Sequence, residues 1–472
     1  PWTRIFNIDA GHFDGLTAYA AANTMRLDDM NPHFFRTHDG GKTWTEINTG
    51  IAGGAVSNAI REDPRVKGLL YAATDTQVWV SYDDGDHWES LRIDMPAISV
   101  RDLEVKDDST CLCSDLIAGT HGRGFYILDD ITPLRQAAAA RRAQTAYLFK
   151  PATAVRVRFA TNDPTPLAPE VAAGENPPPG AIINYYLATN ANGPVLLEVL
   201  NATGKVVRSY SSADTAQNPH PGVDPVAYAK VCQQRPNLPN CGLPLYWQAP
   251  PMVIGSRKGV YRFSWDMHFD PIERPDSEIG GGDDAVGAVP HRTYPDSRAP
   301  WVAPGNYTVR LTVNGEKFTQ PMTVRMDPRV KTPAADLARL NTLSKALYDE
   351  AVTAHAAFTE ARVLSGKLAT QSGPEAAALR ASIDSIAPAA TNAGTGGRGG
   401  GGRGGAGGGA APTPTLDRAS AALLAAAMAM QSADMAPTAR DVAAATAARA
   451  QATSALTRWT RSKTKAQSIG SR

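Results

Sequence analysis

A short motif occurs twice near the start of the chain. The stretch THDGGKTW at residues 37–44 returns about 44 residues later as SYDDGDHW at residues 81–88. Both copies fit the pattern hydroxyl-x-Asp-x-Gly-x-x-Trp. The shared positions are Thr37, Asp39, Gly41 and Trp44 in the first copy, and Ser81, Asp83, Gly85 and Trp88 in the second. Repetition at a fixed period indicates similar units that stack or are arranged radially, so it constrains the fold more than any other feature.

Strand-like segments surround both copies. Short runs rich in Tyr, Val, Trp and Ala alternate with turns rich in Asp and Gly throughout residues 1–135. Residues 116–120 and 125–128 form a third unit, with Asp129 and Asp130 where a third copy would begin. Short strands at this period are typical of four-stranded β-propeller blades. The sequence therefore predicts that residues 1–135 form propeller blades.

The repeated residue types have a mechanical role in such turns. An Asp side chain accepts hydrogen bonds from the backbone that follows it. Gly adopts backbone conformations that other residues resist, and Trp buries a large apolar surface. Asp39, Asp83, Trp44 and Trp88 are therefore predicted to fasten the turns, and the two Asp residues are not expected to be catalytic.

The two copies resemble the Asp-box, or BNR repeat, of sialidase-like and sortilin-like β-propellers. The flanking residues 26–32, 61–64, 68–72 and 120–135 strengthen the likeness to the last blades of secreted bacterial proteins of this type, often labelled glycosyl hydrolases. The resemblance implies an extracellular or periplasmic location. Because a propeller normally needs four or more blades to close, it also implies that N-terminal blades of a longer protein are missing, or that the exposed blade edges are covered in another way.

A second β region is predicted after the blades. Residues 136–150 are expected to be a linker, and residues 151–330 an immunoglobulin-like or fibronectin-like β-sandwich. Asn314 and Gly315 give a strong hairpin signal between its last two strands. The strand-like runs are residues 153–159, 181–187, 195–200, 206–210, 260–265, 307–313 and 318–326.

Two long loops rich in Pro and Gly, residues 213–251 and 271–300, interrupt these strands. Loops of this length are functional or disordered. An acidic cluster beside the second loop offers oxygen ligands that suit Ca²⁺, but a solvated loop is the favoured interpretation, and no metal or cofactor is predicted. The cluster is His268, Asp270, Glu273, Asp276 and Glu278.

Four cysteines are present. Cys232 and Cys241 share a loop and are the predicted disulfide pair, which would favour an oxidising compartment. Cys111 and Cys113 are poor partners in a strand, because residues i and i+2 lie about 7 Å apart on one face. A metal site would need more soft ligands than these two supply.

The C-terminal region, residues 331–472, is rich in Ala and is predicted to form a small helical bundle. Thr332 and Pro333 supply a capping hydroxyl and a first-turn proline for its first helix. Three more helices are expected at residues 375–386, 416–430 and 438–461. The Gly-rich stretch 394–411 is predicted to be a flexible linker rather than an RNA-binding segment.

Charge and hydropathy exclude two classes of partner. The net charge of +1 gives no overall attraction to nucleic acid or to an anionic membrane. No run of about 18 apolar residues is present, so no membrane span is predicted.

Candidates for chemistry are few. The chain has no nucleophile elbow, phosphate loop, zinc-protease motif or dinucleotide fingerprint. The catalytic candidates are Asp28, Asp29, His121 and Arg123, with Asp129 and Asp130 beside them. A glycosidase needs two carboxylates that flank the scissile bond, and neighbours such as Asp28 and Asp29 point to opposite faces of a strand. Arg123 can meet an anionic group, although bracing of the strands by His121 and Arg123 is favoured.

Three functional hypotheses follow. The preferred one is the C-terminal portion of a secreted propeller protein that binds a glycan or peptide and is not catalytically self-contained. The alternative is a propeller-type glycoside hydrolase, sialidase-like or xyloglucanase-like, that acts on polysaccharide. A third is a structural role in which the later domains cap the propeller. Two carboxylates that converge about 5–9 Å apart in an open cleft would favour the enzyme.

Overall fold

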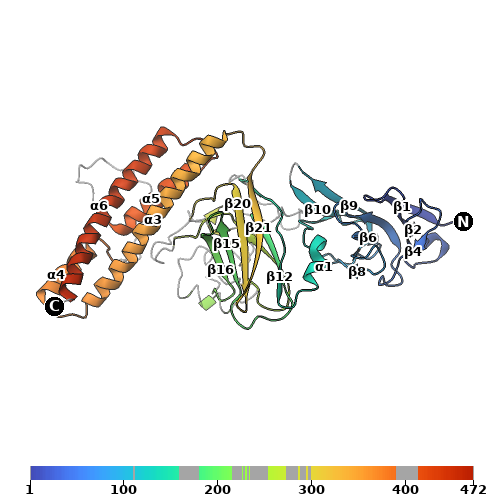
Figure 1. Cartoon of the computed structure of the whole chain (residues 1–472), viewed down its shortest axis with the longest axis horizontal. Coiled ribbons are helices and arrows are strands. Elements are labelled where there is room, and N and C mark those ends of the chain that lie inside the picture. The colour runs from blue at the N-terminus through green and yellow to red at the C-terminus, as the bar shows by residue number, and fades with distance from the viewer. Residues whose placement is uncertain are drawn as a thin grey trace.

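The computed structural model describes most of the chain. The described residues are 2–109, 112–158, 180–214, 226, 229, 230, 233, 254–272, 285, 286, 294, 295, 299–389 and 413–470. Figure 1 shows an elongated molecule with curled sheets at the N-terminal end, larger sheets in the middle and long helices at the C-terminal end. The chain is therefore mainly β with a helical C-terminal segment.

The N-terminal part consists of three antiparallel sheets that follow one another along the chain. Sheet 1 contains β1 (Arg4–Ala10), β2 (Ala18–Asn23), β3 (Phe34–Thr37) and β4 (Thr45–Glu46). Sheet 2 contains β5 (Ser57–Glu62), β6 (Leu70–Thr74), β7 (Val78–Ser81) and β8 (Glu89–Ser90). Sheet 3 contains β9 (Val100–Asp108), β10 (Cys113–Thr120) and β11 (Phe125–Leu128). The two repeated motifs connect the third strand to the fourth in sheets 1 and 2.

Apolar side chains fill the two spaces between these sheets. Tyr19 and Phe34 of sheet 1 share one core with Trp79 and Trp88 of sheet 2. Tyr71 of sheet 2 belongs to a second core with leucines of sheet 3. A buried side chain of this size stabilises the fold by about 1.5–3 kcal/mol. Face-to-face packing therefore joins the three sheets in chain order.

The middle part contains two sheets that share one core, which includes Ile183, Trp265 and Val309. The smaller sheet has the order β12 (Ala146–Leu148), β14 (Ala181–Leu187), β17 (Gly259–Trp265). The larger has the order β13 (Ala154–Arg156), β21 (Glu316–Met326), β20 (Gly305–Val313), β15 (Leu196–Asn201), β16 (Val206–Ser211). Two short strands, β18 (Ala285–Val286) and β19 (Tyr294–Pro295), pair separately.

Each of the seven strand-like runs predicted for this part corresponds to a strand. The hairpin at Asn314 and Gly315 is also present, with both residues at positive φ. β13 pairs with β21 in parallel, and the immunoglobulin-like topology stays a prediction. The stretch predicted as a linker, residues 136–150, contains α1 (Ala137–Ala140) and also β12, which pairs with β14.

The C-terminal part is helical, and its described helices share one core that includes Leu347, Leu379, Leu423 and Trp459. The helices are α3 (Ala334–Leu368), α4 (Pro374–Asp384), α5 (Leu416–Met430) and α6 (Ala439–Gly470). The predicted Gly-rich linker at residues 394–411 lies outside the described residues. No helix in the described part of the chain combines the length and apolar character of a membrane span.

The predicted capping role of Thr332 is wrong. Pro333 occupies the position before α3, and no side chain caps that end. The Thr332 hydroxyl instead donates to the backbone oxygen of Asp434, at 2.6 Å. The local sequence signalled a cap, but a long-range contact with the loop before α6 takes the hydroxyl. The same loop contacts β13 of the middle sheets. The buried Asp434 carboxylate accepts hydrogen bonds from Arg156 and Arg158, each at 2.7 Å.

The structure describes one of the four cysteines, Cys113. Cys113 is disulfide-bonded. The predicted pair Cys232 and Cys241 lies outside the described residues, as does Cys111.

Candidate functional site

Equivalent connections of the three N-terminal sheets lie at one end. Residue numbers rise together along β1 and β5 where the two strands meet. Asn7 accepts from the amide of Ile60, and Asp9 accepts from the amide of Glu62, both at 2.9 Å. Along β5 and β9 the numbers rise together as well, because Asn58 donates to the backbone oxygen of Val100 and Arg61 donates to that of Leu103. The first strands of the three sheets thus run in one direction. The second-to-third-strand connections, residues 24–33, 75–77 and 121–124, therefore share one end, which we call the loop face.

Asp28 and Asp29 lie in the first of these connections. Asp28 has a φ of 63° and closes the short helix η1 (Met25–Leu27). Asp29 accepts from the amide of Asn31 at 3.0 Å and pairs with Nε2 of His33 at 2.8 Å. The Asn31 amide is the largest of the contacts that lower the pKa of Asp29. Asp29 is thus held as a carboxylate within its own loop.

His121 and Arg123 lie in the third connection. The His121 amide donates to the backbone oxygen of Ser99 at 2.8 Å, and Gly122 and Gly124 adopt positive φ on either side of Arg123. Both side chains are exposed. Neither makes a hydrogen bond or ion pair with the described part of the chain, so bracing of the strands is not seen for them. They are available to a ligand on the loop face.

The loop face also contains polar atoms that no sequence motif indicates. Oδ1 of Asp75, Oγ of Ser99 and Nε of Arg101 are buried without a hydrogen-bond partner among the described residues. Asp75 belongs to the second connection, and the backbone of the next residue, Thr76, bonds Ile98 beside Ser99. A buried polar atom without a partner costs about 1–3 kcal/mol, so water or a ligand is expected to satisfy these atoms.

Asp130 does not join the other candidate carboxylates. It is buried, and it accepts from the amide of Thr132 at 3.2 Å and from Asn184 of the middle sheets at 3.4 Å. Its backbone oxygen accepts from Arg262 at 3.0 Å. No contact among the described residues connects it to Asp28 or Asp29. Asp130 therefore belongs to the junction between sheet 3 and the middle sheets.

The carboxylates of the two repeats are engaged in their own turns. Asp39 accepts from the amide and the hydroxyl of Thr43, at 2.9 and 2.7 Å. These bonds, the amide first, lower the pKa of Asp39 to about 2. Asp83 accepts from the amide of His87 at 2.9 Å and from the hydroxyl of Ser81 at 2.9 Å. Neither group is suited to act as a general acid, because each is held in the charged form.

A further polar row crosses the first strands of the three sheets. Arg61 lies 3.0 Å from Asp102 of sheet 3 and 3.7 Å from Asp9 of sheet 1. Burial raises the pKa of Asp9 even though Arg61 opposes the shift. β1 is not among the strands expected from the sequence, although Phe6, Asn7, Ile8 and Asp9 alternate apolar and polar as a half-buried strand does.

The structure describes two members of the predicted acidic cluster, His268 and Asp270. His268 is buried, lies 4.3 Å from the ring of Trp301 and bonds the backbone oxygen of Asp266. Asp270 lies 3.5 Å from Arg208. The remaining predicted members, Glu273, Asp276 and Glu278, lie outside the described residues. Within the described part of the chain, no three His, Cys, Asp or Glu residues gather closely enough to hold a metal.

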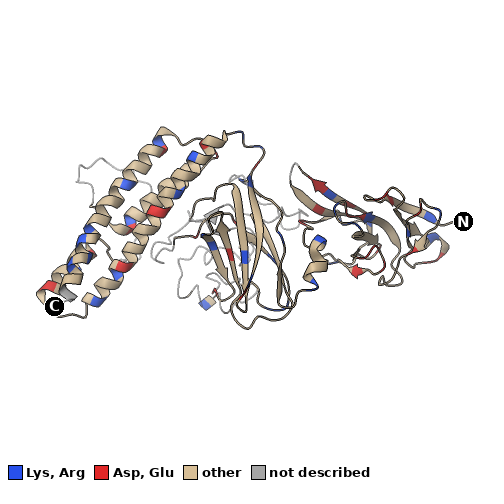
Figure 2. Cartoon of the chain, in the orientation of Figure 1, with Lys and Arg blue, Asp and Glu red and all other residues tan. Residues whose placement is uncertain are grey.

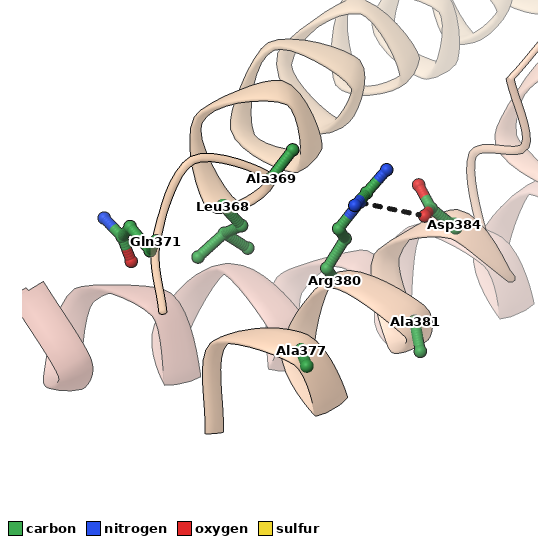
Figure 3. Close-up of a pocket in the computed structure, with 7 residues that line it drawn as sticks. All are labelled: Leu368, Ala369, Gln371, Ala377, Arg380, Ala381 and Asp384. Atoms are coloured by element: carbon green, nitrogen blue, oxygen red, sulfur yellow. Dashed lines mark ion pairs between the residues drawn. The ribbon is translucent and has the colours of Figure 1, made fainter. Parts of the chain in front are cut away.

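The helical part offers a depression between the end of α3 and α4, shown in Figure 3. Leu368, Ala377 and Ala381 line it, and its charged groups, Arg380 and Asp384, pair with each other at 3.6 Å. Lys and Arg are interspersed with Asp and Glu over the ribbon in Figure 2. We therefore take the loop face as the candidate site.

Comparisons with known proteins give a partial likeness. No family model matches the chain. Over 80 residues it is 39% identical to the xyloglucanase Xgh74A of Acetivibrio thermocellus, a match that covers 15% of this chain and 9% of the xyloglucanase. The chain thus has local similarity to a β-propeller glycoside hydrolase, and it spans less than a tenth of that relative's length.

Overlaps with solved structures are limited. A GH74 enzyme of Niastella koreensis has 12% identity and a TM-score of 0.22, with 44% of this chain and 30% of that chain covered. An ancestral GH74 enzyme has 11% identity and a TM-score of 0.20, with 67% and 43% covered. YCF48 bound to D1 peptide has 17% identity and a TM-score of 0.20, with 27% and 37% covered. Overlaps at these scores say nothing about function.

Proposed function

We propose that the chain is the C-terminal portion of a secreted β-propeller protein and that the loop face binds a glycan. One observation carries the proposal: the second and third of these connections, together with the segment that enters β9, present polar groups that no described residue satisfies. These groups are the exposed side chains of His121 and Arg123 and the buried atoms of Asp75, Ser99 and Arg101. Sugar hydroxyls can donate to and accept from such groups.

Two further observations support the choice of ligand and location. The stretch of 39% identity is shared with a xyloglucanase, which favours a polysaccharide over a peptide. The disulfide of Cys113 favours an oxidising compartment, where such bonds persist. These two observations support a glycan as the ligand and a secreted location for the protein.

Binding is favoured over hydrolysis by the state of the carboxylates. Asp29, Asp39 and Asp130 are each engaged by nearby amides or side chains, and a glycosidase needs one carboxyl group that stays protonated. The alternative is a propeller-type glycoside hydrolase. It rests on the local identity to the xyloglucanase and on the raised pKa of Asp9 beside Arg61.

The test is calorimetric titration of the full chain with xyloglucan oligosaccharides, sialyllactose and an unrelated extended peptide. We expect binding to a glycan, weakened at least tenfold by Arg123→Ala and by Asp75→Ala. Arg257→Ala, at an exposed Arg in the turn before β17, is the matched control and should bind as the parent does. Binding to the peptide alone, or to none of the three, would overturn the proposal. Release of reducing ends in the same mixtures would establish the hydrolase instead.

A further inference from the structure

The sequence contains two Asn-Gly pairs, and both lie in connections of the middle sheets. Asn192 and Gly193 lie between β14 and β15, and Asn314 and Gly315 form the turn between β20 and β21. An Asn that precedes Gly is open to a spontaneous reaction, because Gly has no Cβ that shields its own backbone nitrogen. The two pairs therefore place the same chemistry in two different surroundings.

The reaction needs only water as a co-reactant. The backbone nitrogen of the Gly loses its proton and attacks the side-chain carbonyl carbon, Cγ, of the Asn. The new bond closes a succinimide ring, and the side-chain nitrogen leaves as ammonia. Water then adds to one of the two ring carbonyl carbons and breaks its bond to the ring nitrogen. Opening at Cγ leaves Asp, and opening at the backbone carbonyl leaves isoaspartate, in which the chain continues through the side chain.

Asn314 is held away from this reaction. Its Oδ1 accepts a hydrogen bond from the backbone amide of Asn192 at 2.8 Å. Val313 and Glu316 pair on either side of the turn, and Asn314 and Gly315 have φ values of 51° and 86°. A hairpin turn of two residues is fixed by the strands that flank it. The Gly315 nitrogen therefore attacks Cγ of Asn314 only after the hydrogen bond breaks and the turn changes shape.

Asn192 lacks these restraints. It is exposed, and its side chain makes no hydrogen bond with the part of the chain that the structure describes. Gly193 is exposed as well, and no described atom beyond its chain neighbours lies within 4 Å of the point that a Cβ would occupy. Neither residue belongs to a strand. Because the side chain and the following peptide can both rotate, they reach the geometry for attack more often than a fixed pair does.

Two cations lie beside this loop. The Lys258 amide donates to Oδ1 of Asn190 at 2.8 Å, which brings the segment before β17 next to Asn192. Lys258 and its neighbour Arg257 are exposed, and neither makes an ion pair with a described residue. A nearby positive charge favours the deprotonated form of a group. These cations therefore assist loss of the Gly193 proton and stabilise the carboxylate that the reaction leaves.

We propose that Asn192 is a site of spontaneous deamidation in the folded protein, and that the hydrogen bond from its backbone amide protects Asn314 from the same reaction. The product carries a carboxylate where the chain had a neutral amide. Isoaspartate also lengthens the backbone just before β15, where the Val195 amide donates to the Ser212 hydroxyl at 2.9 Å, so the start of β15 should loosen. The site belongs to the middle sheets and not to the loop face, so the inference stands separately from glycan binding.

The test incubates the full chain at mildly alkaline pH in water labelled with heavy oxygen. Mass spectrometry of its peptides measures deamidation at each Asn, and the label marks products formed during the incubation. We expect Asn192 to deamidate at least tenfold faster than Asn314. In concentrated urea both pairs lose their surroundings, and the two rates should then agree within a few-fold, because each Asn is followed by Gly.

Two substitutions at position 192 form a matched pair. Asn192→Ala removes the reactive side chain and keeps the backbone amide, so Asn314 should stay slow. Asn192→Pro removes the amide donor, so deamidation of Asn314 should rise severalfold. Hydrogen exchange of β20 and β21 checks that the hairpin is intact in both variants. Arg257→Gln combined with Lys258→Gln should slow the deamidation of Asn192 severalfold.

Equal rates at the two Asn residues in the folded chain, or a faster rate at Asn314, would overturn the proposal. So would an absence of labelled product at Asn192 after an incubation that converts the urea control. Equal rates at Asn314 in the Ala and Pro variants, with the hairpin intact, would remove the protective role of the hydrogen bond. An unchanged rate at Asn192 in the double Gln variant would remove the role of the cations.

Discussion

The two repeated motifs adopt the same turn but occupy different surroundings. In both, a hydroxyl at the first position donates to the Asp two residues later, at 2.9 Å, and the Gly amide donates to that hydroxyl. Trp88 is nevertheless buried in the core between sheets 1 and 2, whereas Trp44 is 41% exposed. The turn is therefore determined by eight local residues, and the burial of the Trp is determined by the neighbouring sheet.

The largest difference between the motifs is expected from their Trp residues. Trp88→Ala should destabilise sheet 2 by about 3–5 kcal/mol, because it leaves a cavity against Phe34. Trp44→Ala should cost about 1 kcal/mol or less, as exposed substitutions do. Hydrogen exchange of β5–β8 and β1–β4 at increasing urea measures the stability of each sheet separately. Equal losses for the two substitutions would contradict the assigned difference in burial.

The next effect concerns the residue after each repeated Asp. In sheet 2 this is Asp84, which accepts from the Tyr19 hydroxyl at 2.6 Å and from Arg36 at 3.1 Å, whereas the first motif has Gly40. Asp84→Ala should weaken the attachment of sheet 2 to sheet 1 by about 1–3 kcal/mol, because the buried Tyr19 and the partly buried Arg36 lose a charged acceptor.

Hydrogen exchange of the backbone amides in both sheets measures this loss. Both sheets should lose protection, because the contact joins them. Gly40→Ala tests the other motif, where φ is +73°. Strain from that substitution should be confined to the turn of sheet 1. An Asp84→Ala effect confined to sheet 2 would rule out a bridging role.

How far the sequence predicts this molecule depends on the range of the contacts. The repeats, the seven strands of the middle part and the helix at Leu416–Met430 follow local patterns, and the structure has them. Residues whose role comes from contacts distant in sequence were missed or misassigned. Thr332 bonds the loop before α6, and Arg61 joins β5 to β9.

The candidate site also depends on contacts between residues distant in sequence, which local patterns do not predict. Residue type alone indicates Asp28, Asp29, His121 and Arg123. The topology brings their loops to one end, where no contact among the described residues joins them. Asp75 and Ser99 had no motif that singled them out. Their buried, unpaired atoms emerge only when neighbouring sheets pack, so no pattern in a single strand could indicate them.

A smaller effect is expected in the titration of the repeated Asp residues. The pKa of Asp39 is lowered to about 2, chiefly by the Thr43 amide. A lowered pKa in the folded state stabilises the turn above the unfolded value of 3.8, and that stability is lost as pH falls through about 2.

Carbon-13 NMR of the side-chain carboxyl measures the titration directly. The pKa of Asp83 is lowered as well, although burial opposes the hydrogen bonds from His87 there. Thr43→Pro, which removes the amide, should return the pKa of Asp39 toward its ordinary value. Titration of Asp39 near 4 in the parent chain would contradict the hydrogen bonds of the turn.

The smallest expected effect is a difference between sheets 1 and 2 in how their stability depends on pH. Strand registers make His33 and Glu46 of sheet 1 equivalent to Gln77 and Ser90 of sheet 2, and each pair is hydrogen-bonded, at 2.7 and 2.9 Å. Burial lowers the pKa of His33, but its bonds with Glu46 and Asp29 outweigh burial and raise it.

This raised pKa gives sheet 1 stability that is fully present below pH 6.5 and is lost as pH rises through the folded value. The contribution should be about 1 kcal/mol or less, since the groups are partly exposed. Hydrogen exchange, corrected for its intrinsic pH dependence, should show β1–β4 weakening between pH 6 and 9 while β5–β8 do not. His33→Gln combined with Glu46→Ser gives sheet 1 the pair of sheet 2 and should abolish the difference. If the double variant keeps the pH dependence, another group in sheet 1 is its source.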